Sequence, residues 1–191
     1  MEGAPAIALL GLRCSGKTSV GRELARELGL PLVDLDEALL ELCEDRSAAP
    51  LRARHGSAGE LLAAVGEARF RRLEAAALAR ALEGGEAKVL ATGGGVVELE
   101  ASRALLAERA FCVWLSVDPA RLRERLARDP TPRPPLLGAD AAGEIEFLLQ
   151  RREPLYRAVA DRVLDCGDDA PAALARRIAG WVRASRAPGG T

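Results

Sequence analysis

The sequence predicts a three-layer α/β domain with a parallel five-stranded sheet flanked by helices, and three observations support this prediction. Five short apolar runs alternate with amphipathic segments of helical period along the chain, which is the pattern of βαβ units. The chain has 191 residues, of which 49% are apolar, enough for one hydrophobic core. Neither a repeat nor a linker divides it, so we expect a single domain over residues 1–186, with residues 187–191 as a disordered tail.

The expected strands are short apolar runs, as is typical of strands buried on both faces of a parallel sheet. They are Ala6–Leu10, Pro31–Leu35, Lys88–Thr92, Phe111–Val117 and Arg162–Asp165. Apolar residues recur at helical spacing between them, and glycines close several of these segments. The expected helices are Lys17–Leu28, Glu37–Cys43, Glu60–Leu82, Ser102–Glu108, Pro119–Arg128, Glu144–Ala160 and Pro171–Arg186. Two stretches that contain proline and glycine, 44–59 and 129–143, are expected as loops.

Composition excludes several classes of function. The formal net charge is −1, so the chain lacks the basic surface of a nucleic-acid-binding protein. No apolar run approaches the roughly 20 residues of a membrane span, and no signal peptide is visible. The four cysteines lack CxxC spacing and His55 is the single histidine, which disfavours zinc sites and histidine general bases. We expect a cytoplasmic monomer with reduced thiols that binds small molecules rather than nucleic acid or membranes.

The segment GLRCSGKT, Gly11 to Thr18, fits the phosphate-loop pattern G-x-x-x-x-G-K-[ST]. It follows an expected strand and opens an expected helix, which is the context that this motif requires. Backbone amides of the loop and of the helix N-terminus can point at phosphates, where the helix dipole favours anions. Glycine at Gly11 and Gly16 permits the turns and the close approach. The alternative is a glycine-rich turn that binds nothing.

Each residue of this loop has an expected role. Lys17 would reach the β- and γ-phosphates of ATP, and the Thr18 hydroxyl would ligate Mg²⁺. Cys14 is either a small residue that fits the loop or a thiol made redox-sensitive by the helix N-terminus. The expected ATP-binding residues of the loop are Gly11, Cys14, Ser15, Gly16, Lys17, Thr18 and Ser19.

Four further motifs follow the phosphate loop in order: VDLDE at 33–37, GEARFRRLE at 66–74, ATGGGVV at 91–97, and RPPLL at 133–137 with RREPLY at 151–156. Together with the loop they cover most of the chain, and their order and spacing resemble the shikimate kinase family. The resemblance implies a nucleoside-monophosphate-kinase-like P-loop fold. It also implies transfer of the γ-phosphate of ATP, with Mg²⁺, to the 3-hydroxyl of shikimate in aromatic amino-acid biosynthesis.

The resemblance assigns roles to the acidic pair at the end of the second strand. It implies that Asp36 meets the reacting hydroxyl and that Asp34 sits behind Mg²⁺, through water. We expect the two carboxylates to point to opposite sides of the strand end. Phosphoryl transfer needs little base strength, so Asp36 would mainly position and polarise the hydroxyl. The alternative for Asp36 is an acid at a helix N-cap.

Shikimate carries a carboxylate, and a pocket for it needs guanidinium groups. The resemblance assigns this role to Arg71, from the F-R-x-x-E pattern, and to Arg152, from R-x-P-L-Y. Glu74 lies one helical turn after Arg71 and could orient it through an ion pair. The triglycine of Gly93, Gly94 and Gly95 would let backbone amides approach the substrate. Surface arginines and a tight turn are the alternatives for these features.

The resemblance also implies a substrate-binding region at about 37–75 and a lid at about 128–143 that closes over ATP. Arg133 would bring positive charge to the transferring phosphate, which makes it catalytic together with Lys17 and Asp36. Arg128 would stack on adenine. The alternative for this segment is a proline-rich surface connection.

Two departures from the family pattern bear on the acceptor. The chain is longer by roughly ten residues before Arg71, within 45–55, and its lid is about two residues shorter. Two other functions therefore stay open at this point. One is a related kinase of the gluconate-kinase or nucleotide-kinase type, and the other is a non-catalytic module of the same fold. The triglycine and FRxxE motifs favour shikimate, and the intact Lys17, Thr18, Asp36, Arg71 and Arg133 favour catalysis.

Overall fold

A computed structural model describes residues 5–45, 56–128 and 141–185. Its centre is a sheet with strand order β2-β3-β1-β4-β5, in which all neighbours run parallel. The strands are β1 (Ala6–Leu10), β2 (Leu32–Asp34), β3 (Val89–Ala91), β4 (Ala110–Ser116) and β5 (Arg162–Asp165). The predicted five-stranded parallel sheet is therefore confirmed.

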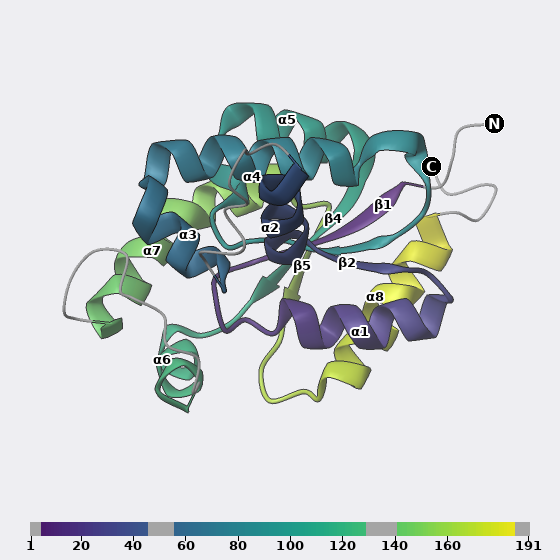
Figure 1. Cartoon of the computed structure of the whole chain (residues 1–191). Coiled ribbons are helices and arrows are strands. Elements are labelled where there is room, and N and C mark those ends of the chain that lie inside the picture. Colours follow the sequence, from purple (N-terminus) through teal and green to yellow (C-terminus); the bar gives the residue numbers. More distant parts are fainter. Residues whose placement is uncertain (1–4, 46–55, 129–140, 186–191) are drawn as a thin grey trace.

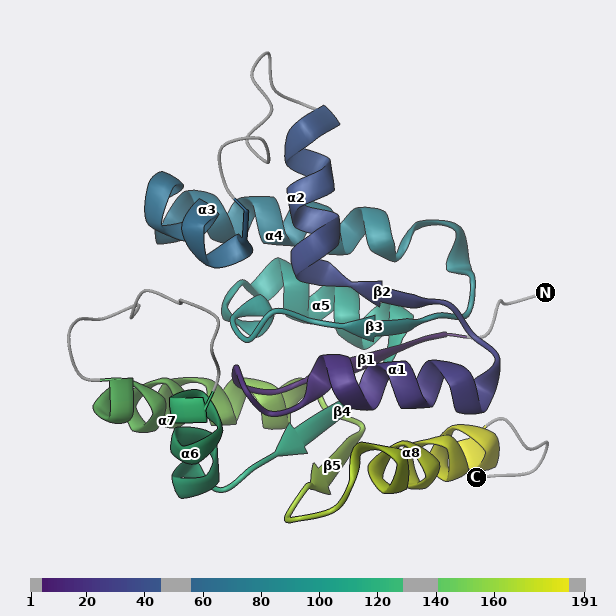
Figure 2. The ribbon, with the colours of Figure 1, turned by 60° about the horizontal axis from the view of Figure 1, so that its bottom comes forward.

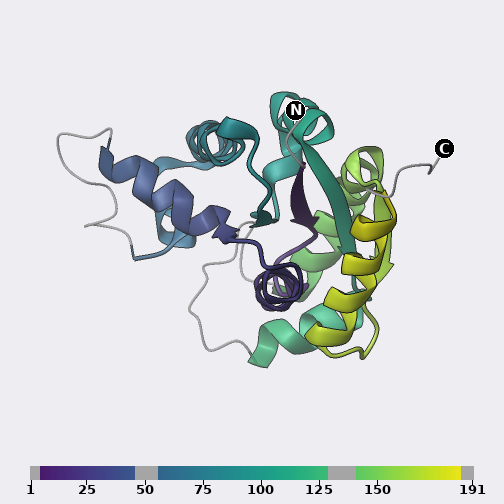
Figure 3. The ribbon, with the colours of Figure 1, turned by 90° about the vertical axis from the view of Figure 1, so that its right-hand side faces the viewer.

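Helices cover both faces of this sheet. In Figure 1, α4 (Glu67–Ala81) and α5 (Glu100–Arg109) lie above the strands, while α1 (Lys17–Leu28) and α8 (Pro171–Ser185) lie below them. Figures 2 and 3 show α2 (Leu35–Asp45) and α3 (Ala58–Val65) grouped with α4 beyond the β2 edge. Helix α6 (Pro119–Arg128) packs against α7 (Ala141–Val159). Short 3₁₀ turns, η2 (Glu83–Gly85) and η3 (Val96–Glu98), complete the described fold.

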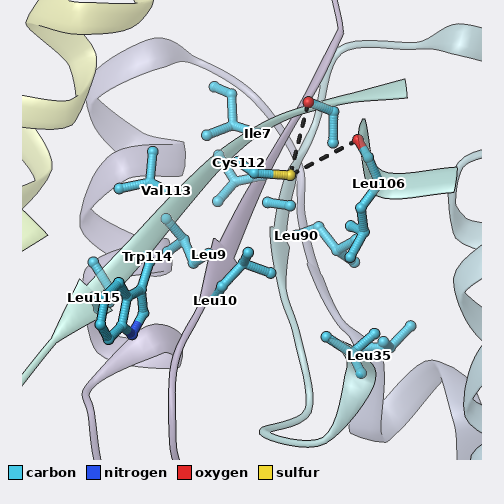
Figure 4. Packing of buried hydrophobic residues seen from close by; sticks show 14 of the residues in the cluster. Ile7, Leu9, Leu10, Leu35, Leu90, Leu106, Cys112, Val113, Trp114 and Leu115 are labelled. Carbon is cyan, nitrogen blue, oxygen red and sulfur yellow. Dashed lines mark hydrogen bonds between the residues drawn. The ribbon is translucent and has the colours of Figure 1, made fainter. Parts of the chain in front are cut away.

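The core lies between the central strands and the helices. Every residue of β1 is buried, and β1 pairs with β4 over its whole length, from Ala6 opposite Ala110 to Leu10 opposite Trp114. Figure 4 shows aliphatic side chains of β1, β3 and β4 packed around Cys112, whose thiol contacts the carbonyls of Leu106 and Ala110. Burial on both faces explains why these strands appear in the sequence as continuous apolar runs.

Several predicted boundaries are wrong, and two of them have a visible local reason. The helix expected over 60–82 is two helices, because Gly66 has φ 76° and ψ 158°, a conformation that only glycine adopts without strain. The first of them begins earlier than expected, because the Ser57 hydroxyl accepts a hydrogen bond from the amide of Glu60, as an N-cap does. Helix α7 begins at Ala141, inside the stretch expected as a loop.

The parallel arrangement determines where a site can form. The carboxyl ends of β1, β2 and β3 meet at one edge of the sheet, where ligands of open α/β sheets bind. The loop 11–16, the acidic residues after β2 and the triglycine after β3 all leave the sheet at this edge. Within the described residues, none of the helices combines the length and the apolar character that a membrane span needs. The expected tail, 187–191, lies outside the described residues.

Candidate active site

The phosphate loop is a tight connection from β1 to α1. Gly11 has φ 143°, and a Cβ there would lie 2.8 Å from the carbonyl oxygen of Leu115 and 2.9 Å from Ser15 Oγ. No other residue would fit this position without a shift of the neighbouring strand. Cys14 adopts a φ of 62°, which lies in the left-handed region that residues other than glycine disfavour. The loop geometry therefore needs glycine at one position and strains the cysteine at another.

Lys17 folds back over this loop. Its ammonium group donates hydrogen bonds to the carbonyl oxygens of Gly11 at 2.9 Å and Leu12 at 2.7 Å, and it lies 3.4 Å from Ser15 Oγ. The side chain is buried, so its charge is held close to the loop and away from bulk water. A cation fixed in this way is placed to meet phosphate oxygens bound at the loop.

The arrangement of the acidic pair at the end of β2 differs from the prediction. Strand β2 ends at Asp34, and Asp36 lies in the first turn of α2. The Thr18 hydroxyl donates to Asp34 Oδ2 at 3.0 Å, and the amide of Asp36 donates to Asp34 Oδ1 at 3.0 Å. Both aspartates line the same two cavities, so the prediction that they point to opposite sides is wrong. Within a strand, residues two apart already share a face. Asp36 lies in the first turn of α2, and this turn keeps it beside Asp34.

Two adjoining cavities lie at this edge of the sheet. The smaller one, about 200 Å³, lies over the phosphate loop, and the larger one, about 360 Å³, lies between the helices α2, α3, α4 and α7. Among the residues that the structure describes, six line both cavities: Arg13, Thr18, Asp34, Asp36, Gly93 and Gly94. A group bound in one cavity can therefore meet a group bound in the other at this shared boundary, which is the geometry that transfer between two ligands requires.

Arg71 on α4 reaches the larger cavity and is only 7% exposed. Its guanidinium donates to Glu74 Oε2 at 2.8 Å, which confirms the expected ion pair one turn along the helix. Burial raises the pKa of the Glu74 carboxyl, and Arg71 opposes this shift. The Nε of Arg71 is buried and has no hydrogen-bond partner among the described residues. A buried donor without a partner costs free energy unless a ligand accepts from it.

Arg152 on α7 lines the same cavity and is 3% exposed. Its Nε and one terminal nitrogen both contact Glu98 Oε1, at 2.6 Å and 2.5 Å. Burial raises the pKa of the Glu98 carboxyl, but the guanidinium groups of Arg152, Arg71 and Arg151 outweigh burial and hold the pKa below its usual range. The carboxylate is thus charged and keeps Arg152 in place.

The triglycine lies directly against these charged side chains. A Cβ on Gly95 would lie 2.2 Å from the Cζ of Arg71, and a Cβ on Gly93 would lie 2.3 Å from Glu74 Oε1. The Gly94 carbonyl accepts a hydrogen bond of 2.5 Å from the Tyr156 hydroxyl. The glycines therefore make room for the arginine and the glutamate, a reason that the sequence did not indicate.

The structure places the predicted ATP-binding residues in different surroundings. Cys14, Gly16, Lys17, Thr18 and Ser19 line the smaller cavity, whereas Gly11 and Ser15 do not line either cavity and support the loop from within. Arg128 is exposed at the end of α6, near Glu124, and lines neither cavity. Arg133 and most of the predicted lid, like the extra segment within 45–55, fall outside the described residues.

Three residues near the site were missed by sequence reasoning. Arg13 occupies a free position of the phosphate-loop motif, lines both cavities, and pairs with the buried Glu144 at 3.1 Å. Glu98 accepts a hydrogen bond from Arg152, and the Tyr156 hydroxyl donates a hydrogen bond to the Gly94 carbonyl. The available signals were the charged residue inside the loop motif and, for Tyr156, its place at the end of the RREPLY motif. Glu98 gave no signal, because it acts on a residue far away in the sequence.

The fold and these two cavities define a P-loop kinase that acts on a small molecule. The profile of the family described as shikimate kinase matches residues 13–183. A shikimate kinase of Stenotrophomonas maltophilia is 39% identical over 188 residues, which are 96% of this chain and 97% of that protein. Another from Symbiobacterium thermophilum is 41% identical over 163 residues, 85% of this chain and 86% of its own. The chain belongs to the shikimate kinase family.

Solved structures agree with this assignment. The shikimate kinase from Acinetobacter baumannii in complex with shikimate has a TM-score of 0.82 and 30% identity, and the match covers 97% of this chain and 96% of that one. A gluconokinase from Sinorhizobium meliloti has a TM-score of 0.64 at 17% identity, covering 96% of this chain and 94% of that one. The second likeness shows a shared fold alone, so the gluconate alternative is not favoured.

Proposed function

We propose that this protein transfers the γ-phosphate of ATP to the 3-hydroxyl of shikimate and forms 3-phosphoshikimate. The observation that carries the proposal is the pair of buried arginines, Arg71 and Arg152, that line one cavity together with the triglycine. Buried guanidinium groups facing a cavity of this size suit a small carboxylate. The shared boundary with the phosphate-loop cavity supports transfer from a nucleotide to that molecule.

On the nucleotide side, the loop amides and Lys17 would bind the phosphates. The hydrogen bond between Thr18 and Asp34 brings the hydroxyl and the carboxylate together beside this loop. Thr18 would ligate Mg²⁺ directly and Asp34 would do so through water, with phosphate oxygens as further ligands. When bound, Mg²⁺ supplies charge neutralisation of the β- and γ-oxygens. Arg133, from the predicted lid, is proposed to add positive charge at the transferring phosphate, and Arg128 to contact adenine.

On the acceptor side, Asp36 would accept a hydrogen bond from the reacting hydroxyl. Its position at the boundary of the two cavities supports this role. A carboxylate there fixes the hydroxyl in line with the phosphate and draws its proton as the new O–P bond forms. Arg71 and Arg152 would bind the substrate carboxylate at the other end of the cavity.

A coupled assay of ADP release with a panel of hydroxy-acids tests this function. We expect turnover with ATP and shikimate that exceeds turnover with gluconate, quinate or water by at least about 100-fold. Turnover that is greatest with gluconate would favour the related sugar-acid kinase. Absence of turnover with every acceptor, together with measurable ATP binding, would favour the non-catalytic module.

A further inference from the structure

Glu98 stands behind the two arginines that line the acceptor cavity. Its side chain is 8% exposed, and it contacts Arg152 at 2.5 Å, Arg151 at 2.8 Å and Arg71 at 3.9 Å. The arginines Arg71 and Arg152 line the cavity, but Glu98 does not. The carboxylate therefore lies outside the space that a substrate would occupy and reaches that space only through the guanidinium groups.

The backbone around Glu98 is fixed. Its amide donates to the Gly95 carbonyl at 2.9 Å and closes the 3₁₀ turn that follows the triglycine. The Arg103 side chain donates to the carbonyls of Val97 at 2.7 Å and Glu98 at 3.1 Å. The carboxylate is thus anchored to the same turn that makes room for Arg71, so the turn, Glu98 and the arginines form one connected unit.

This anchor orients Arg152. Glu98 Oε1 accepts from Nε and from one terminal nitrogen, so three of the five N–H donors of the guanidinium remain for a ligand. Arginine has many rotamers, and ordering it on binding reduces affinity. A guanidinium that is already held by a buried carboxylate loses less freedom when the ligand binds. The contact therefore preorganises the arginine for its ligand.

We infer that Glu98 is a positioning residue for the acceptor, which acts through Arg152 and thereby sets the affinity for the substrate carboxylate. This inference rests on the proposed function, because it concerns how the acceptor of that reaction is bound. Arg151 provides a matched comparison. It contacts the same carboxylate but is exposed and does not line the cavity, so its charge is screened by solvent.

The test measures kcat and KM for shikimate and for ATP in wild type, Glu98→Ala, Glu98→Gln and Arg151→Ala, with thermal denaturation of each. We expect Glu98→Ala to raise the KM for shikimate by about tenfold, as for one disturbed charge-assisted hydrogen bond. The KM for ATP and kcat should stay within about twofold. Glu98→Gln keeps an acceptor oxygen and should show a smaller rise, and Arg151→Ala should show none.

A double-variant cycle shows whether Glu98 acts through Arg152. In an Arg152→Ala background, Glu98→Ala should change the KM for shikimate by less than about twofold, because the positioned group is already missing. If Glu98→Ala changes the KM for shikimate equally with and without Arg152, the inference is overturned. A folded Glu98→Ala variant whose KM for shikimate is unchanged or lowered also overturns it. If Glu98→Ala does not fold, Glu98→Gln decides, and an unchanged KM in that variant overturns the inference. A wild-type protein that does not phosphorylate shikimate overturns the proposed function itself.

Discussion

The phosphate-loop cavity and the acceptor cavity share a boundary but are built in different ways. Most of the residues that line the loop cavity belong to one continuous segment, from Arg13 to Ser19, and Lys17 is held by the backbone carbonyls of Gly11 and Leu12 just before that segment. The acceptor cavity collects side chains from α2, α3, α4 and α7. Of its two arginines, Arg71 is held by Glu74 on the same helix, and Arg152 is held by Glu98 from another element. A bound phosphate therefore depends on local geometry, whereas the acceptor depends on an ion-pair network that tertiary packing assembles.

The difference has an energetic basis. Backbone amides at a helix N-terminus are already ordered by the helix, so binding an anion there orders few further groups. The buried guanidinium groups must be neutralised in the empty protein, and Glu74 and Glu98 do this. A buried ion pair gains little net stability, but removal of one partner leaves a costly buried charge. Substitutions in the acceptor cavity should therefore affect the acceptor, while those in the loop should affect catalysis with any acceptor.

The largest expected effect comes from the loop. Lys17→Ala should lower kcat by about 10²–10³, because the lysine is proposed to stabilise charge on the transferring oxygens. The protein should remain folded, since the aliphatic core does not include Lys17. Lys88→Ala is the matched control, because the Lys88 ammonium also donates to a backbone carbonyl, that of Ala81, at 2.9 Å. Lys88 lines neither cavity. Turnover close to wild type in Lys17→Ala would contradict the role of the loop.

The boundary residue should show the next largest effect. Asp36→Asn is expected to lower kcat by about 100-fold with nucleotide affinity unchanged, because the role proposed for this carboxylate is to bind the acceptor hydroxyl rather than ATP. A nucleotide titration by calorimetry beside the rate assay separates the two effects. A collapse of ATP affinity with a surviving rate at saturating ATP is the result that this role does not allow.

A smaller effect is expected where the triglycine meets the arginine. Gly95→Ala places a methyl group 2.2 Å from the Arg71 guanidinium, so the arginine must move and the KM for shikimate should rise by about tenfold to 100-fold. The KM for ATP should change little. Gly180→Ala on α8 is the control, because a Cβ there meets nothing within 4 Å. Equal KM for shikimate in wild type and Gly95→Ala would mean that Arg71 does not bind the acceptor.

The smallest effect concerns the strained cysteine. Cys14 has a φ of 62°, which costs a residue with a Cβ about 1–2 kcal/mol. Glycine also has greater freedom in the unfolded chain, which offsets part of this strain. Cys14→Gly should therefore raise the free energy of unfolding by about 1 kcal/mol, which corresponds to an increase in Tm of about 2–4 °C. Cys14→Ala keeps the Cβ and should show no such gain. Equal Tm values for the glycine and alanine variants would show that the backbone is not strained there.

The sequence predicted best what depends on neighbouring residues. The bounds of β1 and α1 agree with the structure, because an apolar strand, a glycine loop and a C-capping Gly29 define them locally. The break at Gly66 was missed because the helical pattern continues on both sides of it. Glu98 was missed because its partner Arg152 is 54 residues away, and nothing in a single sequence joins two such residues. Charged residues that support a site from behind are therefore found only once the packing is known.

The most direct test of the acceptor cavity compares shikimate with its methyl ester, which lacks the negative charge. Wild type, Arg71→Ala and Arg152→Ala are assayed with both compounds at saturating ATP. If both arginines bind the carboxylate, wild type should have a KM for the ester that is higher by about tenfold to 100-fold or more, since each charge-assisted hydrogen bond contributes about 1.5–3 kcal/mol. Each alanine variant should lose most of this discrimination. A wild type that uses the ester as readily as the acid would contradict carboxylate binding by Arg71 and Arg152.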